Sequence, residues 1–170
     1  MFRSTAAQYG LWAGLATIAL MVIAYVLDPR LMISPGVIWG SLLFYIYFMV
    51  RAVREVAQAW TGEGRVPFRL CLQPAFLVYL VASALYYAFY YLMFTVVDPG
   101  LADIQEAMVL EQLGNLEGLF GPDRVEEMRR VLEEEGFQVS LLSVLINFGQ
   151  GLIGGFILSL IVTGLLRSRY

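Results

Sequence analysis

Four long apolar stretches limit the folds open to this chain more than any other feature of its sequence. They cover residues 9–27, 31–50, 70–97 and 141–166. Each is about as long as the ~20 residues that an α-helix needs to cross a bilayer. Hydrophobic residues make up 59% of the 170 positions and charged residues only 15%, which is unlike a soluble domain. The sequence therefore predicts an all-α, polytopic membrane protein, with residues 1–170 forming a single membrane domain that contains four transmembrane helices.

The distribution of arginine predicts the orientation of these helices. The chain has no lysine, and seven of its 11 arginines fall on the side that holds both termini and the loop between the second and third stretches. The other side holds four arginines and 12 of the 14 acidic residues. Because short cytoplasmic loops carry an excess of positive residues, we expect a multi-pass protein of the inner (cytoplasmic) membrane with both termini in the cytoplasm.

The segment between the third and fourth stretches, residues 98–136, has a different character. It carries 11 acidic residues against three arginines. Apolar residues recur there at helical spacing on both sides of Gly121-Pro122, as with Leu101, Ile104 and Met108 before the break. This pattern predicts an amphipathic helical hairpin outside the cytoplasm. The hairpin is either a solvated cap that closes the bundle or a docking surface for another protein.

Pairs of small residues four positions apart occur on every predicted span. We expect helix-packing seams at Gly10, Gly14, Gly36, Gly40, Ala84, Ala88, Gly151 and Gly155. Helices in lipid associate through close backbone approach, which such pairs permit. The glycine-rich run 149–155 exceeds what one neighbouring helix needs, which leaves a homodimer seam open as an alternative to packing within the chain. It does not fit a nucleotide-binding loop, because it lies inside an apolar span and lacks a Lys-Ser/Thr pair.

Polar side chains at membrane depth are the candidates for a functional site. Asn147 and Gln150 share one helical face, and together with Tyr86 and Tyr90 they form a candidate polar path for a lipid or ligand. The alternative interpretation is that the amides and hydroxyls, including Thr17, Ser83, Ser159 and Thr163, form hydrogen bonds between helices. For the tyrosines the alternative is packing with interfacial anchoring. No Asp, Glu or Arg stands at the centre of a span, which counts against a proton-coupled carrier.

The residue inventory also excludes much enzymatic chemistry. The chain has no histidine and one cysteine, Cys71. It therefore lacks an imidazole base, histidine ligands for a metal and the thiols for an intramolecular disulfide. The apolar spans contain no paired carboxylates. We therefore expect a protein that is not an enzyme, with no catalytic residue, no metal site and no cofactor.

The order of several weak motifs resembles a known family. Tyr9-Gly10 precedes a span rich in small residues, Arg51-Ala52-Val53-Arg54 ends the second stretch, and a charged hairpin separates a Tyr-Tyr-rich third span from a glycine-rich last span. Over essentially its whole length the chain resembles the bacterial membrane family called domain of unknown function 4199. It departs from that pattern in the loop 62–68, where the family often carries lysine. The resemblance implies four-helix membrane topology in the bacterial inner membrane, and it implies no activity.

These observations predict an integral inner-membrane protein acting as a non-catalytic accessory or scaffold subunit. Its expected partners are membrane lipid and either a second copy, as a homodimer, or a larger membrane complex, with no nucleic acid. The alternative is a small lipid or solute translocator, or a helper of a lipid-linked glycan enzyme.

Overall fold

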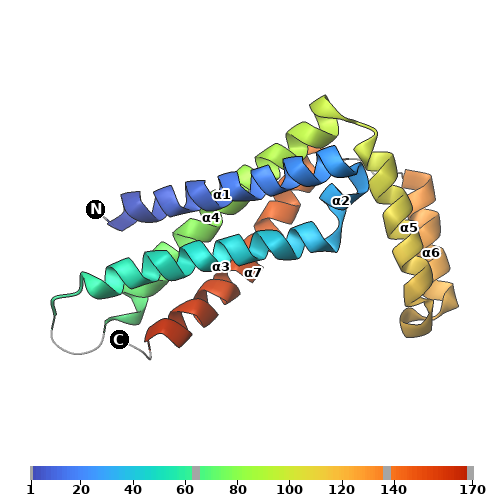
Figure 1. Ribbon diagram of the computed structural model, residues 1–170. Coiled ribbons are helices and arrows are strands. Elements are labelled where there is room, and N and C mark those ends of the chain that lie inside the picture. Colours follow the sequence, from blue (N-terminus) through green and yellow to red (C-terminus); the bar gives the residue numbers. More distant parts are fainter. Residues whose placement is uncertain (1, 63–65, 136–138, 168–170) are drawn as a thin grey trace. The chain divides into compact units, whose positions relative to one another are not determined.

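The structure is a computed structural model that describes residues 2–62, 66–135 and 139–167. Its elements are α1 (Phe2–Leu27), α2 (Pro29–Ile33), α3 (Pro35–Gln58), α4 (Phe68–Leu92), the π-helix η1 (Met93–Val97), α5 (Leu101–Phe120), α6 (Pro122–Glu135) and α7 (Leu141–Arg167) (Figure 1). The described residues contain helices and no strand. The prediction of an all-α fold is confirmed.

Four helical segments of the described chain are long and apolar enough to cross a membrane. They are Thr5–Leu27, Pro35–Gln58, Phe68–Val97 and Leu141–Leu166. These segments confirm the four predicted transmembrane helices and indicate a multi-pass membrane protein.

The second span begins later than predicted, at Pro35 instead of Leu31. Residues 29–33 form the separate helix α2, whose first turn is capped by the Asp28 carboxylate accepting a hydrogen bond from the Arg30 amide at 2.8 Å. Ser34 is extended, with φ −66° and ψ 149°, because a residue before proline is sterically excluded from the helical region. The apolar run is therefore divided at the Ser34-Pro35 bond.

The described chain divides into two compact units, and a single membrane domain over residues 1–170 stays a prediction. The first unit contains residues 1–89 and 145–170, and the second contains residues 90–144. All of α1, α2 and α3 and most of α4 and α7 lie in the first unit. The second unit contains α5, α6 and η1.

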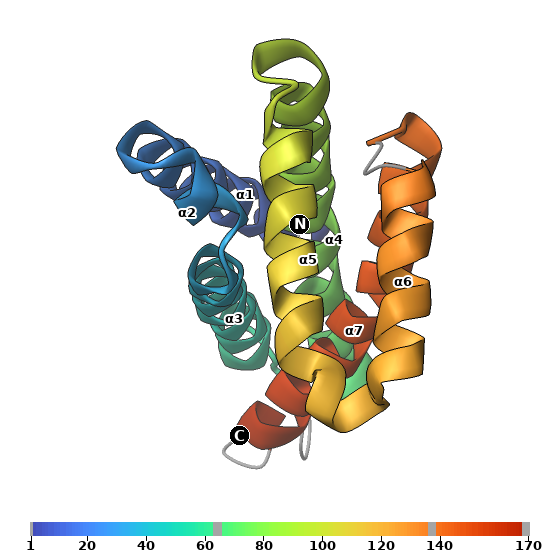
Figure 2. The ribbon, with the colours of Figure 1, turned by 90° about the vertical axis from the view of Figure 1, so that its right-hand side faces the viewer.

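Many buried residues of the first unit are small, and many of its large apolar residues are exposed on the surface. Helices α1 and α3 run side by side (Figures 1 and 2). On α1 the buried residues include Ala6, Ala13 and Thr17, whereas large apolar residues such as Leu43 on α3, 68% exposed, point outward. Exposed apolar surface of this extent is unusual for a soluble monomer. It is the arrangement expected where lipid surrounds the helices.

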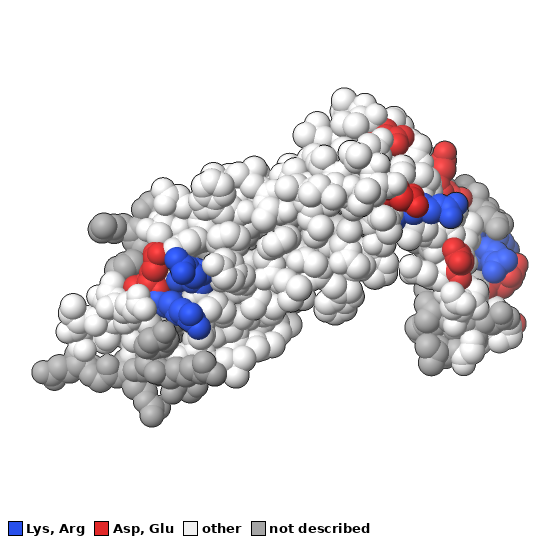
Figure 3. All heavy atoms as spheres, in the orientation of Figure 1, with Lys and Arg blue, Asp and Glu red and all other residues white. Residues whose placement is uncertain are grey.

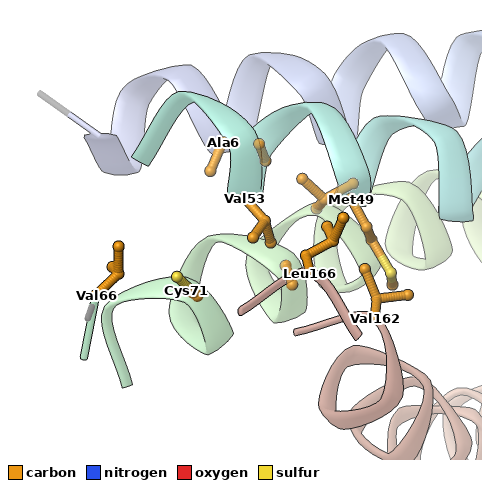
Figure 4. Packing of buried hydrophobic residues seen from close by; sticks show 10 residues of the cluster. Ala6, Met49, Val53, Val66, Cys71, Val162 and Leu166 are labelled. Carbon is orange, nitrogen blue, oxygen red and sulfur yellow. The ribbon is translucent and has the colours of Figure 1, made fainter. Parts of the chain in front are cut away.

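A buried cluster joins the four long helices near the end that holds the start of α1 and the end of α7. It consists of Ala6, Met49, Ala52, Val53, Val66, Cys71, Ala75, Val78, Val162 and Leu166 (Figure 4). Every described span therefore contributes to one core. The surface shown in Figure 3 carries no charged side chain over the central part of these helices.

The second unit contains the predicted helical hairpin. Helices α5 and α6 lie side by side and are joined at Gly121, whose φ of +83° favours a residue without a side chain (Figure 2). Pro122 begins α6, as is common for the first residue of a helix. Leu113 and Val125 are buried, while Met128 is exposed.

Candidate functional site

The glycine pair on α1 lies against α4. A Cβ added to Gly10 would lie 2.7 Å from the Val81 Cβ, and one added to Gly14 would lie 2.6 Å from Leu85 Cδ1. Real Cβ atoms essentially never approach another heavy atom this closely. The two positions therefore hold α1 close to α4 through the absence of a side chain.

The small pairs on α3 and α4 have different surroundings. A Cβ on Gly40 would lie 3.1 Å from Leu20 on α1. A Cβ on Gly36 would meet only Ser34, the residue just before α3. Ala84 and Ala88 are exposed on α4. A packing role for Ala84 and Ala88 stays a prediction that requires a surface outside the described chain.

Two tyrosines of α4 attach α7 to the first unit. The Tyr79 hydroxyl donates to the Gly151 carbonyl at 2.9 Å, and the Tyr87 hydroxyl donates to the Asn147 carbonyl at 3.1 Å. A Cβ added to Gly155 would overlap the Tyr79 ring, and one added to Gly151 would lie 3.3 Å from the Tyr87 hydroxyl. The glycines Gly151 and Gly155 thus make room for tyrosine side chains from within the same chain.

The outer face of α7 has no neighbour in the described unit. Asn147, Gln150, Gly154, Ile157 and Ile161 are exposed there, at alternating spacings of three and four residues. Within the part of the chain that the structure describes, neither the Asn147 nor the Gln150 side chain has a hydrogen bond. A Cβ added to Gly154 would meet nothing within 4 Å. This face, called the α7 outer face below, combines two amide side chains with a glycine.

The residues of the predicted polar path have separate surroundings. In the first unit Tyr86 packs edge-on against Tyr87, with 5.1 Å between ring centroids, while Asn147 and Gln150 are exposed on the α7 outer face. In the second unit the Tyr90 hydroxyl donates to Gln105 Oε1 at 2.7 Å, and its ring stacks on Phe94. A path through all four residues stays a prediction. The tyrosines that reach α7 from α4 are Tyr79 and Tyr87.

The buried hydroxyls bond mainly within their own helices. Thr17 donates to the Ala13 carbonyl, Ser83 to Leu80 and Ser159 to Gly155. Each of these hydroxyls reaches a carbonyl three or four residues earlier, as Ser and Thr do on helices. Thr17 also forms a side-chain hydrogen bond with Tyr45 of α3, which is a bond between helices of the expected kind. The Thr163 hydroxyl is buried without a partner in the described structure.

A groove of about 420 Å³ lies between α3 and α4 in the first unit. It is lined by Ile38, Trp39, Ser41, Leu42, Tyr45, Tyr79, Ser83, Tyr86 and Tyr87. The volume is within the range of small-molecule sites. Tyr45 and Tyr79, both in the lining, meet edge-to-face with 5.5 Å between ring centroids. The groove, called the α3–α4 groove below, was not predicted, because its two walls are 40 residues apart in sequence.

A polar contact near the end of α3 was also missed by sequence reasoning. The Tyr9 hydroxyl of α1 donates to the Glu55 carboxylate, and the Tyr9 ring packs near Phe48 with 6.0 Å between centroids. The partners are 46 residues apart, and no spacing rule in the sequence relates them. The contact joins the first half of α1 to the last turns of α3.

Comparison with known proteins identifies a family for this chain but assigns it no activity. The family model described as "Protein of unknown function (DUF4199)" matches residues 8–168, which confirms the resemblance found in the sequence. No curated protein and no solved structure matches the chain.

Proposed function

We propose a role for this protein on the premise that the chain belongs to DUF4199, a family of proteins of unknown function. The proposed role is that of a non-catalytic accessory or scaffold subunit, which joins a membrane complex through the α7 outer face. The membrane in this proposal is the bacterial inner membrane, and both termini are cytoplasmic. One observation carries the role: two amide side chains without a hydrogen bond project from a membrane span.

The position of these amides makes a partner helix the best explanation. Gln150 lies nine residues after Leu141, the start of a span of 26 residues, so it is about 13 Å along the helix axis. An amide without a partner is costly in hydrocarbon. Asn and Gln in transmembrane helices instead bond across to neighbouring helices.

The geometry of the face fits helix pairing. Its alternating spacing of three and four residues is that of a left-handed helix pair. Gly154 stands in open space between Gln150 and Ile157 and gives a partner backbone room to approach. The partner is a second copy, whose amides would pair with each other, or a span of another subunit.

The hairpin supplies a second contact surface in this proposal. On α6, Met128 and Val131 are exposed beside the exposed carboxylates of Glu126 and Glu127. Apolar groups surrounded by charge are typical of protein docking surfaces. This supports the docking interpretation over a solvated cap.

The test is native mass spectrometry of the protein released gently from its own host membrane. We expect a homo-oligomer or a stoichiometric second protein in the wild type, lost in the double variant Asn147→Leu, Gln150→Leu. Gln73→Leu is the matched control, because Gln73 is an exposed amide on α4 outside the α7 outer face. A monomer in the wild type, or an oligomer unchanged in the double variant, would refute the proposal.

A second candidate function is a lipid or solute translocator, or a helper of a lipid-linked glycan enzyme. The observation that favours it is the α3–α4 groove, which contains Tyr86 of the predicted polar path. For this candidate, the same spectrum would show a bound lipid and an oligomeric mass unaffected by the Asn147 and Gln150 changes.

A further inference from the structure

The α3–α4 groove has an unusual lining for a surface within membrane spans. Seven of its nine lining residues carry a hydroxyl or an indole N–H, and only Ile38 and Leu42 are purely apolar. Even so, most of the surface that they present is apolar, since the tyrosine rings form the walls. A ligand that fits it therefore combines a large apolar part with a small polar part.

The hydrogen bonds already made by the lining residues limit the polar part of the ligand. Four hydroxyl protons are already donated to backbone carbonyls. The donors are Ser41 to Val37 at 2.8 Å, Ser83 to Leu80 at 3.2 Å, Tyr79 to Gly151 at 2.9 Å and Tyr87 to Asn147 at 3.1 Å. A hydroxyl that donates its proton still has lone pairs to accept with. The Ser41 and Ser83 hydroxyls can therefore accept from a ligand hydroxyl.

The charge of the lining limits the ligand further. No arginine or other charged residue is among the nine lining residues. Recognition of phosphate relies on arginine or lysine, or on backbone amides at a helix start. The groove consequently favours an uncharged head group over a phosphate.

The location of the groove in the membrane explains why its ligand has an apolar part. Both walls belong to membrane spans, so the opening faces hydrocarbon and not water. Trp39, 65% exposed, stands four residues after the start of its span, at the depth where tryptophan meets the head-group layer. Tyr45 lies six residues further along α3, about 9 Å deeper.

We propose that the α3–α4 groove binds one uncharged lipid with a hydroxyl-bearing head group, of the diacylglycerol class. The hydrocarbon tail lies between the tyrosine rings, and the head-group hydroxyl donates to the lining hydroxyls. The site lies on α3 and α4 and does not depend on assembly through the α7 outer face.

The test uses the full-length protein in phosphatidylcholine vesicles with a photoactivatable, clickable diacylglycerol. Labelled positions are located by mass spectrometry of peptides. Leu42→Trp fills the groove, and Leu43→Trp makes the same change at an adjacent position that is 68% exposed and outside the lining. Ile38→Trp is a second filling variant at a lining residue that is itself 54% exposed, so it tolerates a larger side chain.

We expect saturable labelling of α3 and α4 lining residues in the wild type and in Leu43→Trp. In both filling variants, labelling should fall to the level of the surrounding lipid-facing helix surface. Equal labelling of the filling and control variants, or labelling spread evenly over all spans, would overturn the site. A phosphatidic acid probe with the same tails should label the groove more weakly, and equal labelling by it would overturn the proposed head group.

Discussion

Gly155 has no space for a side chain, because the Tyr79 ring lies over its backbone. That ring cannot easily move away. Its hydroxyl is bonded to Gly151, and its edge packs against Tyr45. Gly151 and Gly155, which could also have formed a dimer seam, thus have a packing role within the chain. A substitution at either glycine is therefore expected to change the stability of the fold first, and assembly only as a consequence.

The substitution Gly155→Ala tests this residue-scale interpretation. Overpacking of this kind costs about 1–3 kcal/mol, so we expect a clear fall in the midpoint of thermal unfolding in detergent. Gly149→Ala is the control, since a Cβ there would meet nothing within 4 Å and Gly149 is not part of the α7 outer face. Adding Tyr79→Ala to Gly155→Ala should relieve the overlap, and a double variant no better than the sum of its parts would argue against the contact.

Thr163 offers a substitution that is expected to raise the unfolding midpoint instead of lowering it. Its hydroxyl is buried without a partner in the described structure, and such a group costs about 1–3 kcal/mol. Thr163→Val keeps the shape and removes the hydroxyl, so we expect a higher unfolding midpoint. Thr17→Val is the matched control, because the Thr17 hydroxyl is bonded to Ala13, and it should give no increase. Equal shifts in the two variants would disprove the assignment.

At the scale of elements, α7 depends on α4 for its position in the first unit. Two tyrosine hydroxyls reach its backbone, and two edge-to-face aromatic pairs join the same helices. The pairs are Tyr87 with Phe148 and Phe76 with Phe156, at centroid distances of 5.7 and 5.6 Å. Polar and aromatic contacts thus connect α4 and α7, while glycine contacts connect α1 to α4.

Removing both hydroxyls should loosen α7 without removing the rings. Hydrogen bonds between transmembrane helices average about 0.6 kcal/mol each, so Tyr79→Phe with Tyr87→Phe should raise amide hydrogen exchange in residues 145–155 by a few fold. Tyr47→Phe, on an exposed ring of α3, is the control. Unchanged exchange in α7 would mean that the hydroxyls do not hold the helix.

The four long helices and the hairpin were predictable from the sequence, whereas the separate helix α2 and the neighbours of each helix were not. Apolar length determined the four spans, and the Gly121-Pro122 break determined the hairpin, since both signals are local. The α3–α4 groove and the Tyr79 contact with Gly155 depend on which helices become neighbours. Periodicity cannot supply that information, because small-residue pairs occur on all four spans and do not encode which span each one meets.

At the scale of the whole molecule, the number of crossings and the distribution of charge determine the topology. If each of the four described spans crosses the membrane, the start of α1 and the end of α7 lie on one side. Seven of the 11 arginines belong to that side by sequence position, and positive residues are retained in the cytoplasm. The proposed topology therefore has the acidic hairpin on the opposite side, because an odd number of crossings precedes it.

Single cysteine substitutions test this orientation. They start from a Cys71→Ala background, which removes the one cysteine of the sequence, whose thiol is buried. Asp28→Cys, between α1 and α2, and Glu127→Cys, on α6, should react with a membrane-impermeant maleimide in intact cells. Gln58→Cys, at the end of α3, should react only after the cells are permeabilised, because the chain has crossed the membrane once more between Asp28 and Gln58. The opposite pattern would reverse the orientation. If Glu127→Cys instead follows Gln58→Cys, the hairpin is cytoplasmic and the third span does not cross.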